Sequence, residues 1–172
     1  MGNGEMNIYS NSQHMDYYRN GESFLKASER CFGEKNGEEF TIFSGSENGT
    51  EVKQLSVPTV VNAAFACEMF LKALISNAGL DIPKGRDGHN LLKLYKVLSN
   101  DIQEKISSFC FRDSSKTEFE NFLNNHAENF VNIRYFIEKK EFSNMSPMCI
   151  YQLTFNLSQI TKYILQGEKY NE

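Results

Sequence analysis

The chain has 172 residues, of which 40% are hydrophobic and 13% aromatic, and its formal net charge is −4. A chain of this length and composition folds as one domain with its own core, which excludes a disordered protein and a small disulfide-dependent scaffold. The acidic balance excludes a basic field over the whole chain that would attract nucleic acid, and it is compatible with a local basic patch.

The four cysteines lie far apart and form no C-x-x-C pair, so the sequence predicts neither a metal knuckle nor a redox motif. The opening segment, MGNGEMNIYS, lacks the apolar region of a signal peptide, and no apolar run is expected to reach membrane-spanning length. We therefore expect a reduced, cytoplasmic, bacterial protein without a metal, a cofactor or a membrane partner.

In chain order, residues 1–13 are polar and glycine-rich, and we expect them to be flexible. The spacing of the apolar residues that follow predicts a first helix from Met15 to about Phe32. Gly21 weakens this helix, and Gly33 is a suitable end for it.

The next segment, residues 34–56, is rich in Gly, Ser, Asn and Glu and has too little apolar content to form a domain. Its sequences FTIF and TEVKQL flank Asn48-Gly49, a dipeptide that suits the turn of a hairpin. The segment is therefore predicted to form either a short hairpin or a loop excursion.

Two helices are predicted after this segment. Pro58 begins the second helix of the chain, which runs to about Asn77 and is ended by Gly79. The loop DIPKGRDGHN then leads to a third helix, which starts near His89 and stops near Asn100.

Three more helical segments complete the pattern. A short helix capped by Asp101 runs to Phe109, a long helix spans 115–140, and a last helix begins at Ser146-Pro147. Short links between these segments predict an all-α fold, an up-and-down bundle of four to five helices that forms one domain over residues 1–172.

The second helix carries two charges within an otherwise apolar stretch, NAAFACEMFLKALI. Glu68 and Lys72 are one turn apart, in the favourable order for an ion pair, and share a stripe with Phe65 and Ile75. One interpretation is that this stripe faces solvent, as charged pairs usually do. The other places Glu68 in a buried polar pocket with a histidine or arginine partner, while the Lys72 ammonium reaches the surface.

Two residues on other segments are candidate partners for Glu68. His89 stands at the start of the third helix, and the alternative is that it caps that helix or faces solvent. Arg134 lies in the apolar segment FVNIRYFIE, and its alternative partner is Glu138, one turn on. His126 falls on an apolar stripe, where a histidine is more often a core residue than a ligand. The histidines have no metal-type spacing.

Three motifs occur in order along the chain: E-x-x-L-K-A-L, then G-H-x-L after a glycine-containing loop, then F-x-x-x-R-Y. Together they resemble the HEPN family, the higher eukaryotes and prokaryotes nucleotide-binding domains, and in particular its small stand-alone bacterial members. The residues that carry the resemblance are Glu68, Leu71, Lys72, Ala73, Leu74, Gly88, His89, Leu91, Phe130, Arg134 and Tyr135. The resemblance implies a helical bundle that often dimerises, and many members are RNases or toxins in phage defence or partners of nucleotidyltransferases.

The catalytic motif of the resembled family is an arginine followed, after four to six residues, by a histidine at the dimer groove. The chain departs from it, because the corresponding positions after Arg134 hold Lys139, Lys140 and Glu141, and no other arginine has a histidine in that window. RNA cleavage by the 2′-hydroxyl needs an acid or base of near-neutral pKa, usually histidine. A phosphate-binding loop, H-E-x-x-H and G-x-S-x-G are also missing. The sequence therefore favours a chain without catalytic activity.

Three functions remain as hypotheses. The first is a non-catalytic HEPN-like domain that binds a nucleotide, an RNA or a protein partner such as a nucleotidyltransferase, in phage defence or a toxin–antitoxin system. The second is an RNase with a displaced site that uses Arg134 with His126 or His89, and the third is a structural dimerisation module. The candidate polar cluster is Glu68, Lys72, His89, His126, Arg134 and Tyr135. The high aromatic content further predicts a homodimer, because exposed apolar patches mark interfaces.

Overall fold

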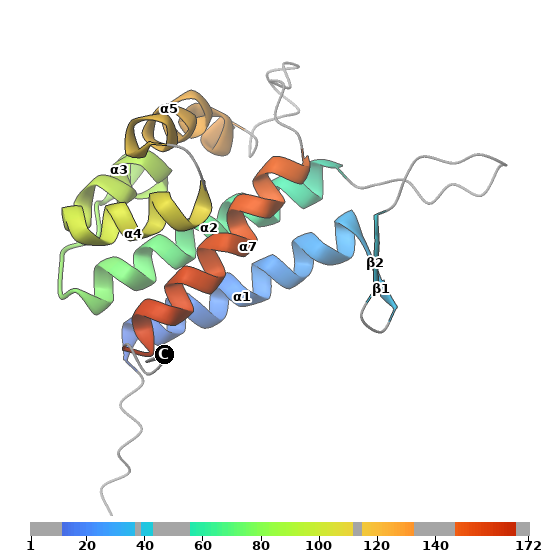
Figure 1. Cartoon of the computed structure of the whole chain (residues 1–172), viewed down its shortest axis with the longest axis horizontal. Helices are drawn as coiled ribbons and strands as arrows, with labels where there is room; N and C mark the ends of the chain where they lie inside the picture. The colour runs from blue at the N-terminus through green and yellow to red at the C-terminus, as the bar shows by residue number, and fades with distance from the viewer. Residues whose placement is uncertain (1–11, 37–38, 43–55, 112–114, 133–146, 168–172) are drawn as a thin grey trace, which may run out of the picture.

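The computed structural model describes residues 12–36, 39–42, 56–111, 115–132 and 147–167, which form helices and one hairpin (Figure 1). The elements are α1 (Gln13–Phe32), β1 (Gly33–Asn36), β2 (Glu39–Ile42), α2 (Ser56–Asn77), the 3₁₀ helix η1 (Gly85–His89), α3 (Leu91–Val97), α4 (Asn100–Cys110), α5 (Lys116–Asn132) and α7 (Pro147–Leu165). The predicted all-α bundle is confirmed, and β1 with β2 is the only strand pair among the residues described.

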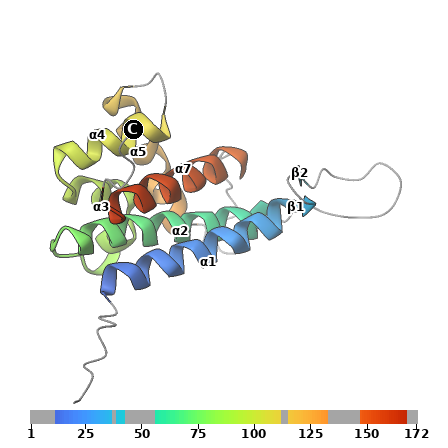
Figure 2. The same ribbon diagram turned by 60° about the horizontal axis from the view of Figure 1, so that its bottom comes forward.

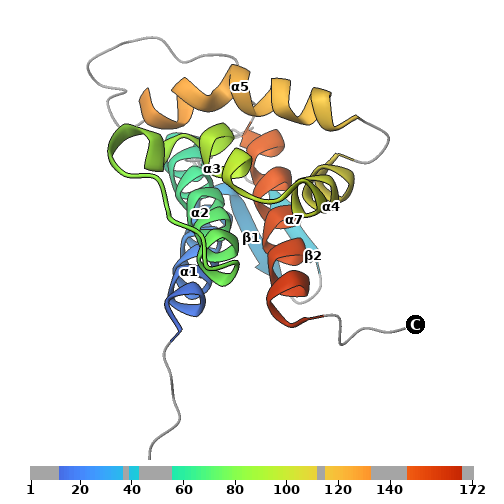
Figure 3. The same ribbon diagram turned by 90° about the vertical axis from the view of Figure 1, so that its left-hand side faces the viewer.

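Three long helices, α1, α2 and α7, lie side by side and form the main body of the bundle (Figure 2). α1 and α2 run antiparallel, and α7 contacts both of them. The shorter helices cover this body, with α3 packed against α2, α4 packed against α7, and α5 lying across α3 and α4 (Figure 3). Helix α2 is therefore in contact with α1, α3 and α7 and forms the centre of the core.

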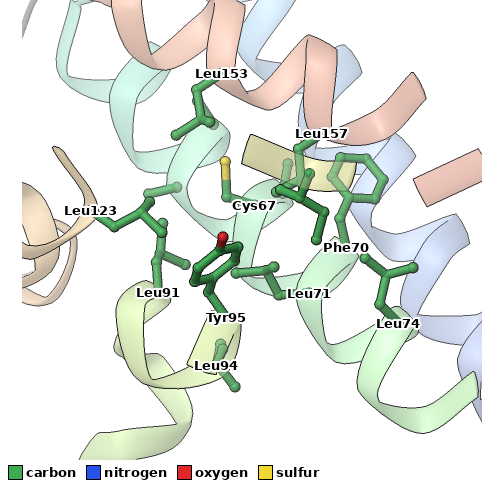
Figure 4. Close-up of a cluster of buried hydrophobic side chains, with 14 of the residues drawn as sticks. Cys67, Phe70, Leu71, Leu74, Leu91, Leu94, Tyr95, Leu123, Leu153 and Leu157 are labelled. Carbon is green, nitrogen blue, oxygen red and sulfur yellow. The ribbon is translucent and has the colours of Figure 1, made fainter. Parts of the chain in front are cut away.

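The central position of α2 follows from its sequence, which is apolar around nearly the whole helix. Val60, Ala63, Cys67, Phe70 and Ile75 have no exposed surface. Leucines from α3, α5 and α7 lie around this helix and complete the core (Figure 4). Close packing of this kind makes the core sensitive to changes of even one methyl group.

Helix α2 is also long and apolar enough, by length and composition, to cross a membrane over Val57–Asn77. The expectation that no apolar run reaches membrane-spanning length is therefore wrong. Glu68 and Lys72 interrupt the apolar run, but the mean hydropathy of the helix remains apolar. In the bundle, 67% of its most apolar window is buried. The central helix of a soluble protein meets the same criterion, so this helix is weak evidence for a membrane protein.

The ends of the long helices follow the predicted glycine signals. α1 ends at Phe32, directly before Gly33, and α2 ends at Asn77. Gly79 adopts a φ of +68°, the left-handed conformation in which glycine ends a helix without steric cost.

The cap of α4 differs from its prediction. The Ser99 hydroxyl accepts a hydrogen bond from the Ile102 amide at 3.5 Å, and Asp101, the predicted cap, lies in the first turn. Serine, asparagine and aspartate are all good N-caps, so the sequence Ser99-Asn-Asp offers several starting points within three residues. An acidic residue in the first turn remains favourable for the helix dipole.

Two connecting segments also differ from their predicted form. Part of the predicted loop DIPKGRDGHN forms η1, and α3 begins at Leu91 with Asn90 as its N-cap. The described part of the FTIF segment, residues 40–42, does lie in a strand, but the partner of that strand is β1, with Asn36 opposite Glu39. This pairing needs only a two-residue connection, the commonest hairpin type. The turn predicted at Asn48-Gly49 lies outside the described residues.

The cysteines should differ sharply in reactivity. Cys67 is completely buried, its Sγ lies 3.2 Å from Thr154 Oγ1, and burial raises its thiol pKa to about 12. Cys149 is exposed on α7. Because the thiolate is the reactive form, we expect an alkylating reagent at pH 8 to label Cys149 rapidly and leave Cys67 unmodified until the protein is unfolded. Peptide mass mapping would measure both rates, and equal rates in the folded protein would contradict this burial.

Candidate functional site

Glu68 is the buried centre of a polar cluster on α2. It is 4% exposed, and its Oε1 accepts a hydrogen bond from Lys72 Nζ at 2.8 Å. His89 Nδ1 lies 3.0 Å from Oε1 and 3.1 Å from Oε2 of the same carboxylate. An ionised carboxylate only accepts hydrogen bonds, so Nδ1 carries the proton in this contact. The burial of Glu68 and its contact with His89 agree with the prediction, and the solvent-facing interpretation of this stripe is wrong.

Lys72 differs from its predicted position. Its side chain is only 12% exposed, because the ammonium turns toward Glu68 on the preceding turn instead of extending to the surface. Once Glu68 is buried between the helices, an ammonium on the same stripe gains more from the carboxylate than from partial hydration. The Glu68–Lys72 ion pair is therefore largely desolvated, and the stability of each charge depends on its partners inside the protein.

The position of His89 is fixed by η1. Gly88 is buried, and a Cβ atom at this position would lie 2.4 Å from the Pro83 carbonyl oxygen, so the backbone can approach only at a glycine. Leu91, two residues beyond His89, is 1% exposed and enters the core. The G-H-x-L motif thus combines a close backbone approach, a contact with Glu68 and a core anchor within four residues.

The cluster opens to solvent on the side of His89, whose side chain is 42% exposed. Three basic residues of the same segment, Lys84, Arg86 and Lys93, are exposed around η1. Lys93 Nζ pairs with Asp87 at 2.7 Å, and both of these side chains are more than half exposed. Asp81 and Asp87 are exposed in the same segment, so residues 81–93 carry a net charge of +1 in a chain that is acidic overall.

The arrangement orients an imidazole beside a basic surface. A carboxylate on Nδ1 fixes both the tautomer and the orientation of a histidine ring. Lys72 meanwhile shares the same carboxylate, so the charge of Glu68 is compensated from two sides. Such a cluster can hold His89 in one position toward an anionic ligand.

The other predicted members of the cluster are not placed by the structure. His126 belongs to α5, but its side chain lies outside the described residues, as do Arg134 and Tyr135. Within the described residues, no group of three or more His, Cys, Asp or Glu side chains could hold a metal ion.

Two further polar contacts join helices far apart in the sequence. Ser158 Oγ donates to Glu22 Oε1 at 2.5 Å, which connects α7 to α1. Tyr151 donates its hydroxyl proton to Glu29 Oε1 at 3.2 Å; burial and the nearby Glu29 carboxylate raise the Tyr151 pKa to about 12. Neither contact could be predicted from the sequence, because partners more than 100 residues apart share no local spacing pattern.

A surface groove between α4 and α7 was also missed. Its volume is about 490 Å³, and we call it the α4–α7 groove; its lining residues are Phe109, Cys110, Tyr151, Gln152, Phe155 and Asn156. The alternation of aromatic and amide residues on α7 could have indicated it, but in the sequence Phe155 looks like a member of the core. In the structure Phe155 is 43% exposed.

Comparisons of the chain with protein-family models, with curated proteins and with solved structures find no match.

Proposed function

We propose that the chain is a non-catalytic, HEPN-like helical domain of the bacterial cytoplasm that binds the phosphates of an RNA or a nucleotide at η1. The observation that carries this proposal is the half-exposed His89, which the buried Glu68 holds at the edge of a basic surface segment. Phosphates are bound by cationic and hydrogen-bond-donating side chains that converge on one surface.

The proposal includes no reaction because the sequence has no histidine at the required distance after any arginine. The contact of His89 Nδ1 with the Glu68 carboxylate orients the ring, as a binding residue requires. An RNase that uses Arg134 with His89 or His126 remains the alternative, and RNA degradation by the purified wild-type chain, abolished in His89→Ala, would favour it.

The proposal predicts a local effect of charge on binding. We expect Lys84→Glu/Arg86→Glu/Lys93→Glu to lower the affinity for a short single-stranded RNA by about tenfold or more, because each lost phosphate contact removes a salt-dependent contribution. Fluorescence anisotropy with a labelled RNA at two salt concentrations would measure the affinity and the salt slope, and unlabelled ATP would test whether a nucleotide competes.

A matched control carries the same change in net charge on other exposed lysines: Lys26→Glu/Lys105→Glu/Lys162→Glu. This control should bind RNA nearly as well as the wild type. Equal losses in the two triple variants would show non-specific attraction, and no loss in either would contradict binding at η1. In those cases a protein partner becomes the better hypothesis.

A further inference from the structure

The α4–α7 groove has aromatic side chains on both of its edges. Phe109, at the end of α4, is 37% exposed, and Phe155, in the middle of α7, is 43% exposed. Among the described residues, only Leu80 and Tyr163 are large hydrophobic residues with comparable exposure. Single exposed apolar residues are common, but two phenylalanines from different helices that flank one hollow form a surface suited to a planar apolar ligand.

The floor of the groove is held in place by its neighbours. The Tyr151 ring lies 6.4 Å from the Phe155 ring and 5.3 Å from the Phe32 ring, and its hydroxyl is bound to Glu29. Phe111, just after α4, packs edge-on against Phe119 at 5.3 Å. A ligand would therefore meet a preformed surface, which reduces the entropic cost of binding.

Two carboxamides complete the groove. Gln152 and Asn156 are one turn apart on α7, so both project from the same face of that helix. The Asn156 amide donates to the Cys110 carbonyl at 3.4 Å, which connects α7 to α4 and leaves the side-chain oxygen as an acceptor. None of the described residues that line the groove is charged, so their chemistry suits a neutral ring with a hydrogen-bonding edge better than a phosphate.

We propose that the α4–α7 groove binds a purine base, with its ring stacked on Phe109 and Phe155 and its edge recognised by Gln152 and Asn156. Aromatic stacking combined with amide contacts is the usual chemistry of base recognition, and Asn and Gln form bidentate pairs with adenine. The groove volume of about 490 Å³ falls in the range of small-ligand sites. This inference uses none of the residues at η1 and does not depend on phosphate binding there.

The test is calorimetric titration of the full chain with adenosine, ribose and indole. Adenosine should bind and ribose should not. Indole has an aromatic ring without the bidentate edge, so its affinity should be lower than that of adenosine by about tenfold or more. Phe109→Ala and Phe155→Ala should each lower adenosine affinity by about tenfold, in proportion to the lost stacking. Asn156→Leu should lower adenosine affinity and leave indole binding unchanged. An adenine oligoribonucleotide compared with adenosine would then show whether the base comes from RNA or from a free nucleoside.

Tyr163→Ala is the matched control, because Tyr163 lies on the same helix, is 39% exposed and does not line the groove. It should bind adenosine like the wild type, and thermal unfolding should show that all variants are folded. Equal affinity for adenosine and indole, or unchanged binding by Phe155→Ala, would overturn the proposal. The proposal would also be overturned if the wild type did not bind adenosine but formed a dimer that Phe155→Ala dissociates. The groove would then be a surface for self-association. Failure of the charge variants at η1 would leave this result unaffected.

Discussion

Replacing Glu68 with glutamine should lower the free energy of unfolding by about 3 kcal/mol, the low end for breaking a buried ion pair by removing one partner. Glutamine keeps the size of the side chain and its hydrogen-bonding ability, so the expected loss comes from the charge. The Lys72 side chain is 12% exposed and would retain its positive charge without the carboxylate at 2.8 Å. His89 now lies within hydrogen-bond distance of both carboxylate oxygens, and the carbonyl oxygen of a glutamine would be its one remaining acceptor there. Urea denaturation at pH 7 would measure the change.

A double variant separates the missing charge from other effects. Glu68→Gln/Lys72→Met removes both charges and retains the apolar length of the lysine stem, so it should recover most of the lost stability. Asp101→Asn is the matched control, because Asp101 and Lys105 form the same i,i+4 pair on the surface, 74% and 42% exposed, at 3.2 Å. That change should remain within about 0.5 kcal/mol. A similarly small change for Glu68→Gln would contradict a structural role for the buried cluster.

The link between Glu68 and His89 could be predicted because two constraints acted together. A carboxylate on a helix with few polar positions must find a partner if it is buried, and the motif after α2 supplied a histidine 21 residues away. The position of Lys72 could not be predicted from the same pattern. Whether a lysine extends to solvent or folds back depends on the space left by neighbouring helices, and the helical spacing of residues carries no information about that space.

The groove was beyond prediction for a related reason. Phe155 is spaced along the sequence like the core residues of α7, but α1, α2 and α4 cover only part of the surface of this helix. Which apolar residue remains exposed depends on the crossing of α4 with α7, and these helices are joined by a long stretch of chain. Local signals performed better: glycines indicated the ends of α1 and α2, and Pro147 indicated the start of α7. Small errors occurred where neighbouring positions were similarly suitable, since α2 begins at Ser56, two residues before Pro58, and Ser99 caps α4 in place of Asp101.

Gly21 shows how the structure can reverse a conclusion drawn from helix propensity. In the sequence this glycine weakens the first helix, and Gly21→Ala would be expected to stabilise it by about 1 kcal/mol. In the structure a Cβ at this position would lie 2.6 Å from Phe70 Cε1 and 2.7 Å from Cδ1. Phe70 has no exposed surface, and its ring also packs 5.8 Å from Tyr18, so it has little room to move.

We therefore expect Gly21→Ala to destabilise the protein by about 2 kcal/mol, a typical cost of overpacking, despite the gain in propensity. Asn20→Ala, at the exposed neighbouring position, should be neutral or slightly stabilising. Phe70→Leu opens space for the new methyl group, so the double variant Gly21→Ala/Phe70→Leu should lose less than the sum of the two single changes, by about 1 kcal/mol. Urea denaturation of the four variants gives this coupling directly. The close contact between α1 and α2 leaves no space for a side chain at residue 21. If Gly21→Ala stabilised the protein as Asn20→Ala does, the two helices would not approach each other at Phe70 as closely as the structure shows.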